Sequence, residues 1–145
     1  MLKTWTGTSP AAAGTSISTP IVTGLDAFES MKIVTIFEGG VGGTLDIYRQ
    51  MCDDQDGSAW VDFAHFAQLA DAAASLTRLY SVTRQTERLT AIAVAVGDTP
   101  ALAAGTVLGG EFGAKMRVVM VAGAGTSAGT AQTIHFLGSP ARRRV

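Results

Sequence analysis

Cysteine, histidine and charge are all scarce in this chain of 145 residues. The single cysteine, Cys52, excludes an internal disulfide. The two histidines, His65 and His135, lie too far apart along the chain to give the close ligand spacing of a structural zinc site. Only 16% of residues are charged and the formal net charge is −1, so the basic footprint of a nucleic-acid-binding protein is missing. The composition argues against a nucleic-acid partner.

Long apolar runs are missing as well. The start of the chain, Met1–Trp5, lacks the apolar core of a secretory signal peptide. A run such as Ala91–Val96 is far too short to cross a bilayer. We therefore expect a protein that is made in the cytoplasm and has no membrane partner.

The clearest pattern that is present is a pair of alternating segments joined by an acidic turn. From Leu45 to Met51 apolar side chains occupy most odd positions, with Arg49 as the exception, and polar side chains occupy most even ones. This alternation is typical of a strand with one buried and one wetted face. Asp53–Ser58 supplies turn residues, and Trp60–Phe66 is rich in the aromatic residues that strands favour. The two segments predict a β-hairpin.

Further short segments between turn residues predict more strands, and long helical periodicity is missing. They are Phe28–Glu38, Leu76–Arg84, Leu89–Val96, Ala101–Leu108, Lys115–Ala122 and Thr130–Leu137. Only Ala67–Ser75 resembles one or two helical turns. Seven or eight strands with this spacing predict an all-β fold, a single antiparallel β-sandwich of jelly-roll-like form.

The composition divides the chain into three parts. Residues 1–24 are mostly Thr, Ser, Ala, Gly and Pro, which predicts an extended N-terminal arm that cannot fold alone. Residues 25–138 form the predicted sandwich, and residues 139–145 form a basic C-terminal tail. The candidate partner-binding residues are the apolar anchors of the arm and the arginines of the tail: Trp5, Ile17, Ile21, Val22, Arg142, Arg143 and Arg144.

The sharpest catalytic motif is Gly125–Gly129, which matches the G-x-S-x-G pattern around a nucleophilic serine, Ser127. The pattern needs a following helix and a later acidic residue, but Thr130–Leu137 is β-branched and no Asp or Glu follows Ser127. The same loop fits a weak dinucleotide fingerprint, and too little chain remains for the required βαβ unit. A flexible loop of small residues is the better interpretation.

Two other arrangements suggest chemistry. Asp53, Asp54 and Asp56 resemble the start of a calcium loop, but His65 stands where the final glutamate belongs, so a solvated hairpin turn is the more common explanation. Cys52 and His65 face each other around the hairpin turn and form a conceivable nucleophile pair, although nothing beside Cys52 would activate the thiol. We predict no catalytic, cofactor-binding or metal-binding residues and no cofactor.

The hairpin also carries a resemblance. A strand that opens with Thr-Leu-Asp at Thr44, an Asp-Gly turn and the W-x-D-x-A-x-F segment Trp60–Phe66 resemble small β-sandwich proteins of tailed bacteriophage particles. The G-x-x-x-R-V-V segment Gly113–Val119 and the small-residue turn Gly123–Gly129 fit the same pattern, which covers Phe28–Phe136. The resemblance implies a virion structural protein of the capsid decoration (cement) type, located in the virion, with no catalytic residues.

The partners implied are the major capsid protein or other virion proteins, and we expect a homo-oligomer on the particle. The alternative is a carbohydrate-binding or host-adhesion module, since sandwich folds often host sugar sites. Its binding platform would be built from aromatic side chains on the strands, which more often belong to a core. They are Tyr48, Trp60, Phe63, Phe66 and Tyr80.

Overall fold

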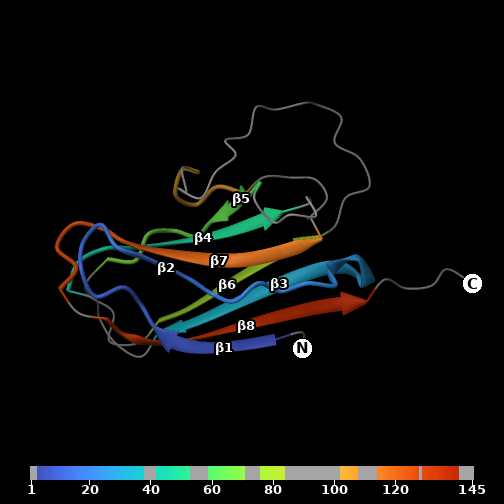
Figure 1. The fold of residues 1–145 in the computed structure, drawn as a ribbon, viewed down its shortest axis with the longest axis horizontal. Helices are drawn as coiled ribbons and strands as arrows, with labels where there is room; N and C mark the ends of the chain where they lie inside the picture. The colour runs from blue at the N-terminus through green and yellow to red at the C-terminus, as the bar shows by residue number, and fades with distance from the viewer. Residues whose placement is uncertain are drawn as a thin grey trace, which may run out of the picture.

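The computed structural model describes residues 3–37, 42–52, 59–70, 76–83, 102–107, 114–127 and 129–140. Its elements are β1 (Lys3–Thr8), β2 (Ser16–Ser18), the 3-10 turn η1 (Leu25–Ala27), β3 (Phe28–Phe37), β4 (Leu45–Cys52), β5 (Val61–His65), β6 (Leu76–Thr83), β7 (Lys115–Ala122) and β8 (Ala131–Pro140). One four-stranded sheet has the order β1-β8-β3-β6 and the other has the order β2-β7-β4-β5. All the strand pairings are antiparallel, and the two sheets pack as a sandwich (Figure 1). The expected all-β sandwich is confirmed.

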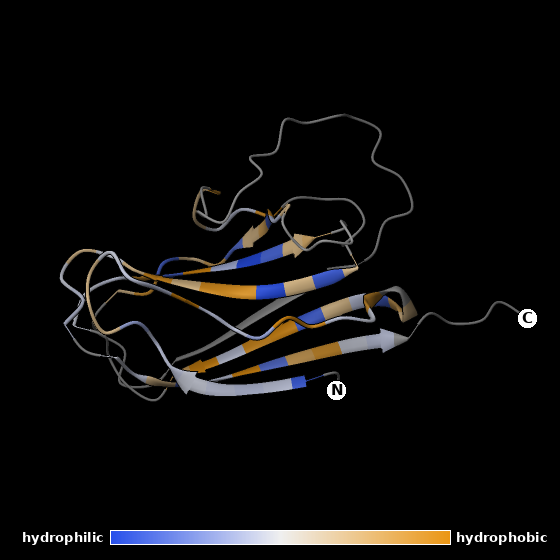
Figure 2. Ribbon diagram, viewed as in Figure 1, coloured by the Kyte–Doolittle hydropathy of each residue, from blue (hydrophilic) through white to orange (hydrophobic). Residues whose placement is uncertain are grey.

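Alternating burial explains why the central strands form. In β3, Met31, Ile33, Thr35 and Phe37 are buried on one face, and Lys32, Val34 and Ile36 on the other face are more exposed. In β4, Leu45 and Ile47 point inward in the same way. A period of two places alternate side chains on opposite faces of a sheet, so each strand contributes one apolar row to the interior. Figure 2 shows these apolar stretches on the strands of both sheets.

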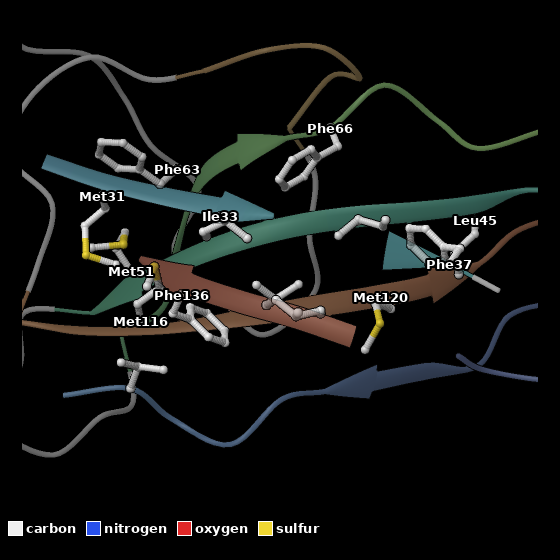
Figure 3. Close-up of a cluster of buried hydrophobic side chains, with 14 of the residues drawn as sticks. Met31, Ile33, Phe37, Leu45, Met51, Phe63, Phe66, Met116, Met120 and Phe136 are labelled. Atoms are coloured by element: carbon white, nitrogen blue, oxygen red, sulfur yellow. The ribbon is translucent and has the colours of Figure 1, made fainter. Parts of the chain in front are cut away.

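The core lies between the two sheets. Figure 3 shows methionine and phenylalanine side chains from both sheets meeting there, among them Met31, Met116, Met120 and Phe136, which are fully buried. Methionine is flexible and fills irregular gaps between branched side chains.

The predicted hairpin is confirmed as β4 and β5, with a register shift between Arg49 and Gln50.

Residues 3–24 differ from the expected extended arm, because they belong to the sandwich. β1 pairs with β8 from Lys3 to Thr8, and β2 pairs with β7. Val22 forms an isolated bridge to Met116 and is 4% exposed within the core. The segment has little apolar content of its own, but β7 and β8 offer open edges whose backbone groups it satisfies. Composition alone did not show those edges.

Three smaller expectations also change. Residues 102–107, inside the strand expected at Ala101–Leu108, contain a turn at Ala104–Gly105 and one bridge from Val107 to Ala64. Residues 67–70 are not helical. β8 continues to Pro140, so the last strand includes the first two residues assigned to the tail. The strand expected at Leu89–Val96 lies outside the described residues.

Candidate functional site

The N-terminal segment forms an edge of the sandwich that carries no charged side chain after Lys3. β1 is an edge strand of one sheet and β2 is an edge strand of the other. Their neighbours, β8 and β7, meet across the interior, where Gln132 Nε2 donates to Met120 Sδ at 2.6 Å. Residues 4–24 contain no Asp, Glu, Lys or Arg. Figure 2 shows β1 in pale colours apart from its blue N-terminal end, so most of the strand is neither strongly hydrophilic nor strongly apolar. We call residues 3–24 the N-terminal edge.

Trp5 packs inward from β1. It lies opposite Ile134, a core residue of β8, and it is partly buried against the core cluster. Its indole covers Gly7, where a Cβ would overlap the ring. The glycine is therefore needed for this close approach, and Trp5 offers only part of its surface to a partner.

Ile17 and Ile21 are the exposed large apolar side chains of the N-terminal edge, at 37% and 46% exposure. Val22, which we expected to bind a partner, is instead buried in the core. Its N–H and carbonyl both bond to Met116 of β7, at 2.8 and 2.9 Å, and this pairing turns the side chain inward. Of the four apolar anchors, Val22 is thus unavailable. The tail residues Arg142, Arg143 and Arg144 lie outside the described residues.

Along β2 the backbone N–H and carbonyl groups of successive residues point alternately toward β7 and away from it. The carbonyl of Thr15 and the N–H of Thr19 both bond to β7, each at 2.9 Å. Because neighbouring residues in an antiparallel strand direct their backbone groups to opposite sides, those of Ser16 and Ser18 point away from β7. Among the described residues no strand pairs with this outer side of β2.

A polar cluster covers the outer face of β4 and β5. His65 Nε2 lies 3.0 Å from Asp46 Oδ1, and His65 Nδ1 lies 2.7 Å from the carbonyl oxygen of Leu102. The Tyr48 ring stacks on the His65 ring with centroids 3.9 Å apart. Gln68 Nε2 donates to Asp46 Oδ2 at 2.9 Å. Burial raises the pKa of the Tyr48 phenol above its ordinary value, and the negative charges of Asp46 and Asp62 add to that effect.

A second chain of contacts continues along this face. Arg117 Nε donates to Gln50 Oε1 at 2.8 Å, and Gln50 Nε2 donates to Asp62 Oδ1 at 2.9 Å. The Arg117 guanidinium lies 4.1 Å from the centroid of the Trp60 ring. Asp62 Oδ2 accepts from the backbone N–H of Leu102 at 3.0 Å. These groups bond to one another, so the cluster stabilises the attachment of the Leu102 segment to β5 rather than offering an open binding site.

Arg49 is a buried residue whose placement the sequence hinted at. It occupies the inward phase of β4 and is 0% exposed. Its Nε donates to Met116 Sδ at 3.0 Å, and its guanidinium lies 4.9 Å from the centroid of the Phe63 ring. The break that Arg49 makes in the apolar alternation was the only signal of this arrangement.

The structure separates the Cys52–His65 pair. His65 lies opposite Tyr48, four residues before Cys52 on β4. Four residues of extended strand span about 13 Å, so the thiol and the imidazole are not neighbours. The expectation that they face each other is wrong, because the register shift and the turn length place His65 further along β4. The Asp53–Asp56 turn lies outside the described residues.

The Ser127 loop joins β7 to β8, so a strand follows it where the nucleophile motif needs a helix. The loop packs on the start of β4: Gly123 N and Thr126 Oγ1 both donate to the carbonyl oxygen of Thr44, each at 2.8 Å. A Cβ on Gly43 would overlap the backbone of this loop. Residues 123–126 are thus a packed turn in contact with β4.

The candidate aromatic side chains that the structure describes do not form an exposed platform, and the Tyr80 side chain lies outside the described ones. Trp60, Phe63 and Phe66 are 2%, 5% and 7% exposed, so they belong to the packed part of the protein. Tyr48 is only partly buried, and one of its faces is covered by His65. Of the candidate sugar-binding aromatics with described side chains, Tyr48 alone has an accessible part.

The described residues hold no group of three or more His, Cys, Asp or Glu side chains able to bind a metal ion. Among the same residues no helix is long and apolar enough to cross a membrane. No known protein family, curated protein or solved structure matches this chain.

Proposed function

We propose that the protein is a non-enzymatic structural component of a phage virion that decorates and stabilises the capsid, with the major capsid protein or another virion protein as its partner. The observation that carries this proposal is the strand order β1-β8-β3-β6 and β2-β7-β4-β5. We infer that this order is a jelly roll, a double Greek key found in viral capsid domains and in lectins. One fold can serve several functions, so the strand order is compatible with both a capsid role and a sugar-binding role. The choice between the two roles rests on the residues at the surface.

The N-terminal edge supports attachment to another protein. Its exposed apolar residue Ile21 and its partly buried Trp5 lie in a segment without charge between residues 4 and 24. Burying an exposed aliphatic side chain contributes on the order of 1.5–3 kcal/mol before ordering costs. Because the strands of this edge are already paired with β7 and β8, binding would require little further ordering of the backbone.

The aromatic residues and the outer face of β4 and β5 favour a structural role over adhesion. Sugar-binding sites use exposed aromatic faces, whereas Trp60, Phe63 and Phe66 are buried. The polar side chains on the outer face of β4 and β5 bond to one another, as between Asp46 and His65. Among the candidate aromatics whose side chains the structure describes, the accessible part of Tyr48 remains for sugar contact.

Particle binding tests the proposal with two aspartate substitutions at equally exposed residues. Ile21 belongs to the N-terminal edge and Val107 lies beside β5, and both are 46% exposed. We expect Ile21→Asp to weaken binding to capsids that lack the protein by roughly tenfold or more, which is about 1.4 kcal/mol. Val107→Asp should bind as the parent does. Cryo-electron microscopy of the decorated particles should place the protein on the capsid exterior.

Two results would overturn the proposal. One is the absence of the protein from purified particles of the phage that encodes it. The other is specific binding on a glycan array that disappears in Tyr48→Ala, because that outcome would favour the adhesion role.

A further inference from the structure

The outer side of β2 is suited to pairing with another strand. The backbone groups of Ser16 and Ser18 point away from β7, and no described strand covers them. Edge strands of soluble proteins are often protected by charged side chains, by Pro or by being very short. Residues 4–24 contain no charged side chain, so only the shortness of β2 and Pro20 limit pairing at this edge. At the other edge of this sheet, residues 105 and 106 bond to His65 of β5, at 3.0 and 2.9 Å. Residues 105 and 106 thus cover one edge of the sheet, and no described strand covers the other.

The sequence of this edge is symmetric. Thr15-Ser16-Ile17-Ser18-Thr19 has the same residues in both directions from Ile17. When two such strands pair antiparallel about Ile17, each residue lies opposite a residue of its own type: Ile opposite Ile, Ser opposite Ser and Thr opposite Thr. A two-fold interface needs one surface that complements itself, and a segment that is symmetric about Ile17 is suited to that.

We propose that β2 pairs antiparallel with β2 of a second copy of this chain, about a two-fold axis that passes beside Ile17. Ser16 of each copy then lies opposite Ser18 of the other, and their outward backbone groups form about four hydrogen bonds. The two Ile17 residues form the non-hydrogen-bonded pair between them, with Cα atoms about 4.5 Å apart. Ile17 shares the inward side of the sheet with Met120, its partner on β7, so the two isoleucines bury each other at the open end of the sandwich.

A second copy fits this edge better than a charged partner. The absence of charge between residues 4 and 24 means that two copies meet without repulsion, while a charged strand would find no counter-ion there. Pro20 follows the strand closely and has no N–H to continue the ladder, so the pairing is confined to about residues 15–19. A contact of this size is small, and we expect a dimer that forms in the roughly micromolar to millimolar range.

Cysteine cross-linking tests the geometry. In a Cys52→Ser background, Ile17→Cys puts one new cysteine in each copy of the dimer. The Cα atoms of these two cysteines lie about 4.5 Å apart, within the range that a disulfide spans. The matched control is Ile21→Cys, whose side chain is more exposed. Residue 21 is four positions from the axis in each copy, so the two introduced cysteines lie eight positions apart along the paired strands. That separation is about 26 Å, which a disulfide cannot span. With oxidised glutathione as the oxidant, Ile17→Cys should form covalent dimers at least roughly tenfold faster than Ile21→Cys.

Sedimentation of the parent chain tests the same contact without a new thiol. Ser18→Pro removes an N–H that points away from β7, so it should abolish the concentration-dependent dimer and leave β2 paired with β7. Val107→Asp should dimerise as the parent does. Equal cross-linking rates for the two cysteine variants, or a parent that stays monomeric at about 1 mM, would overturn the proposal.

This inference concerns the N-terminal edge but does not depend on the proposed function. Both measurements use the isolated protein in solution, without capsids. A protein that dimerises and does not bind particles would refute the capsid role alone, and a monomer that decorates particles would refute the β2 pairing alone.

Discussion

Val22 and Ile21 are neighbours in the sequence, but the structure gives them opposite surroundings. Val22 is 4% exposed within the core cluster, while Ile21 is 46% exposed. Truncating each residue to alanine therefore measures whether the N-terminal segment belongs to the sandwich. In a detached arm both substitutions would leave the free energy of unfolding unchanged.

The size of the expected effect follows from burial. Val22→Ala removes two methyl groups, worth about 0.8 kcal/mol each in transfer free energy, and leaves a small cavity beside Met116. We expect the free energy of unfolding to fall by about 1.5–3 kcal/mol. For a chain of this length, a loss of about 2 kcal/mol lowers Tm by roughly 4–8 °C. Ile21→Ala should change stability by no more than about 0.5 kcal/mol.

Urea unfolding followed by circular dichroism gives both values, with equal slopes showing that each variant unfolds in the same way. The ratio between the two variants is more informative than either value. Similar small changes for Val22→Ala and Ile21→Ala would refute the assignment of residues 3–24 to the sheets. A large loss for Ile21→Ala would show that its side chain is packed, contrary to its exposure.

Two further predictions concern the loop contact and the polar face. Gly43→Ala should cost about 1–3 kcal/mol in urea unfolding, because its Cβ would overlap the backbone of the loop between β7 and β8; an unchanged midpoint would refute that contact. In Tyr80→Phe, the remaining Tyr48 should titrate above the ordinary value of 10.0 in the folded protein and at that value in urea, as followed by phenolate absorbance. Because the unfolded state ionises first, the stability that Tyr48 contributes is complete below about pH 10 and is lost as the pH rises through the raised pKa; in the variant Tyr48→Phe this dependence should disappear.

The central hairpin was predictable because its information is local. In β4 the alternation around Leu45 and Ile47 identifies both the strand and its inward face. The aromatic run that becomes β5 follows after a turn rich in Asp and Gly. Strand period and turn chemistry depend on neighbours in the sequence, so both are visible without the fold.

The candidate site was predictable only in part. Ile17 and Ile21 were identified as apolar residues in a polar segment, and they are exposed at the edge. Val22 was indistinguishable from them in composition, yet its backbone pairing with Met116 turns it into the core. The pairing of His65 with Asp46 and Tyr48 was not anticipated, because it depends on the register of two strands and on the distant Leu102.

The sequence by itself determined that this chain forms strands and that apolar rows alternate with polar ones. The alternation of apolar and polar residues that indicates a strand can be read from neighbouring positions in the sequence. It also determined that the N-terminal segment carries few charges and cannot build a core of its own. The tertiary structure decided where that segment goes. β7 and β8 present backbone groups that need partners, and pairing with them orders residues that have no local reason to be strands. The same long-range pairing decided that Arg49 is buried and that Val22 and Ile21 point to opposite sides, since both outcomes depend on residues far away along the chain.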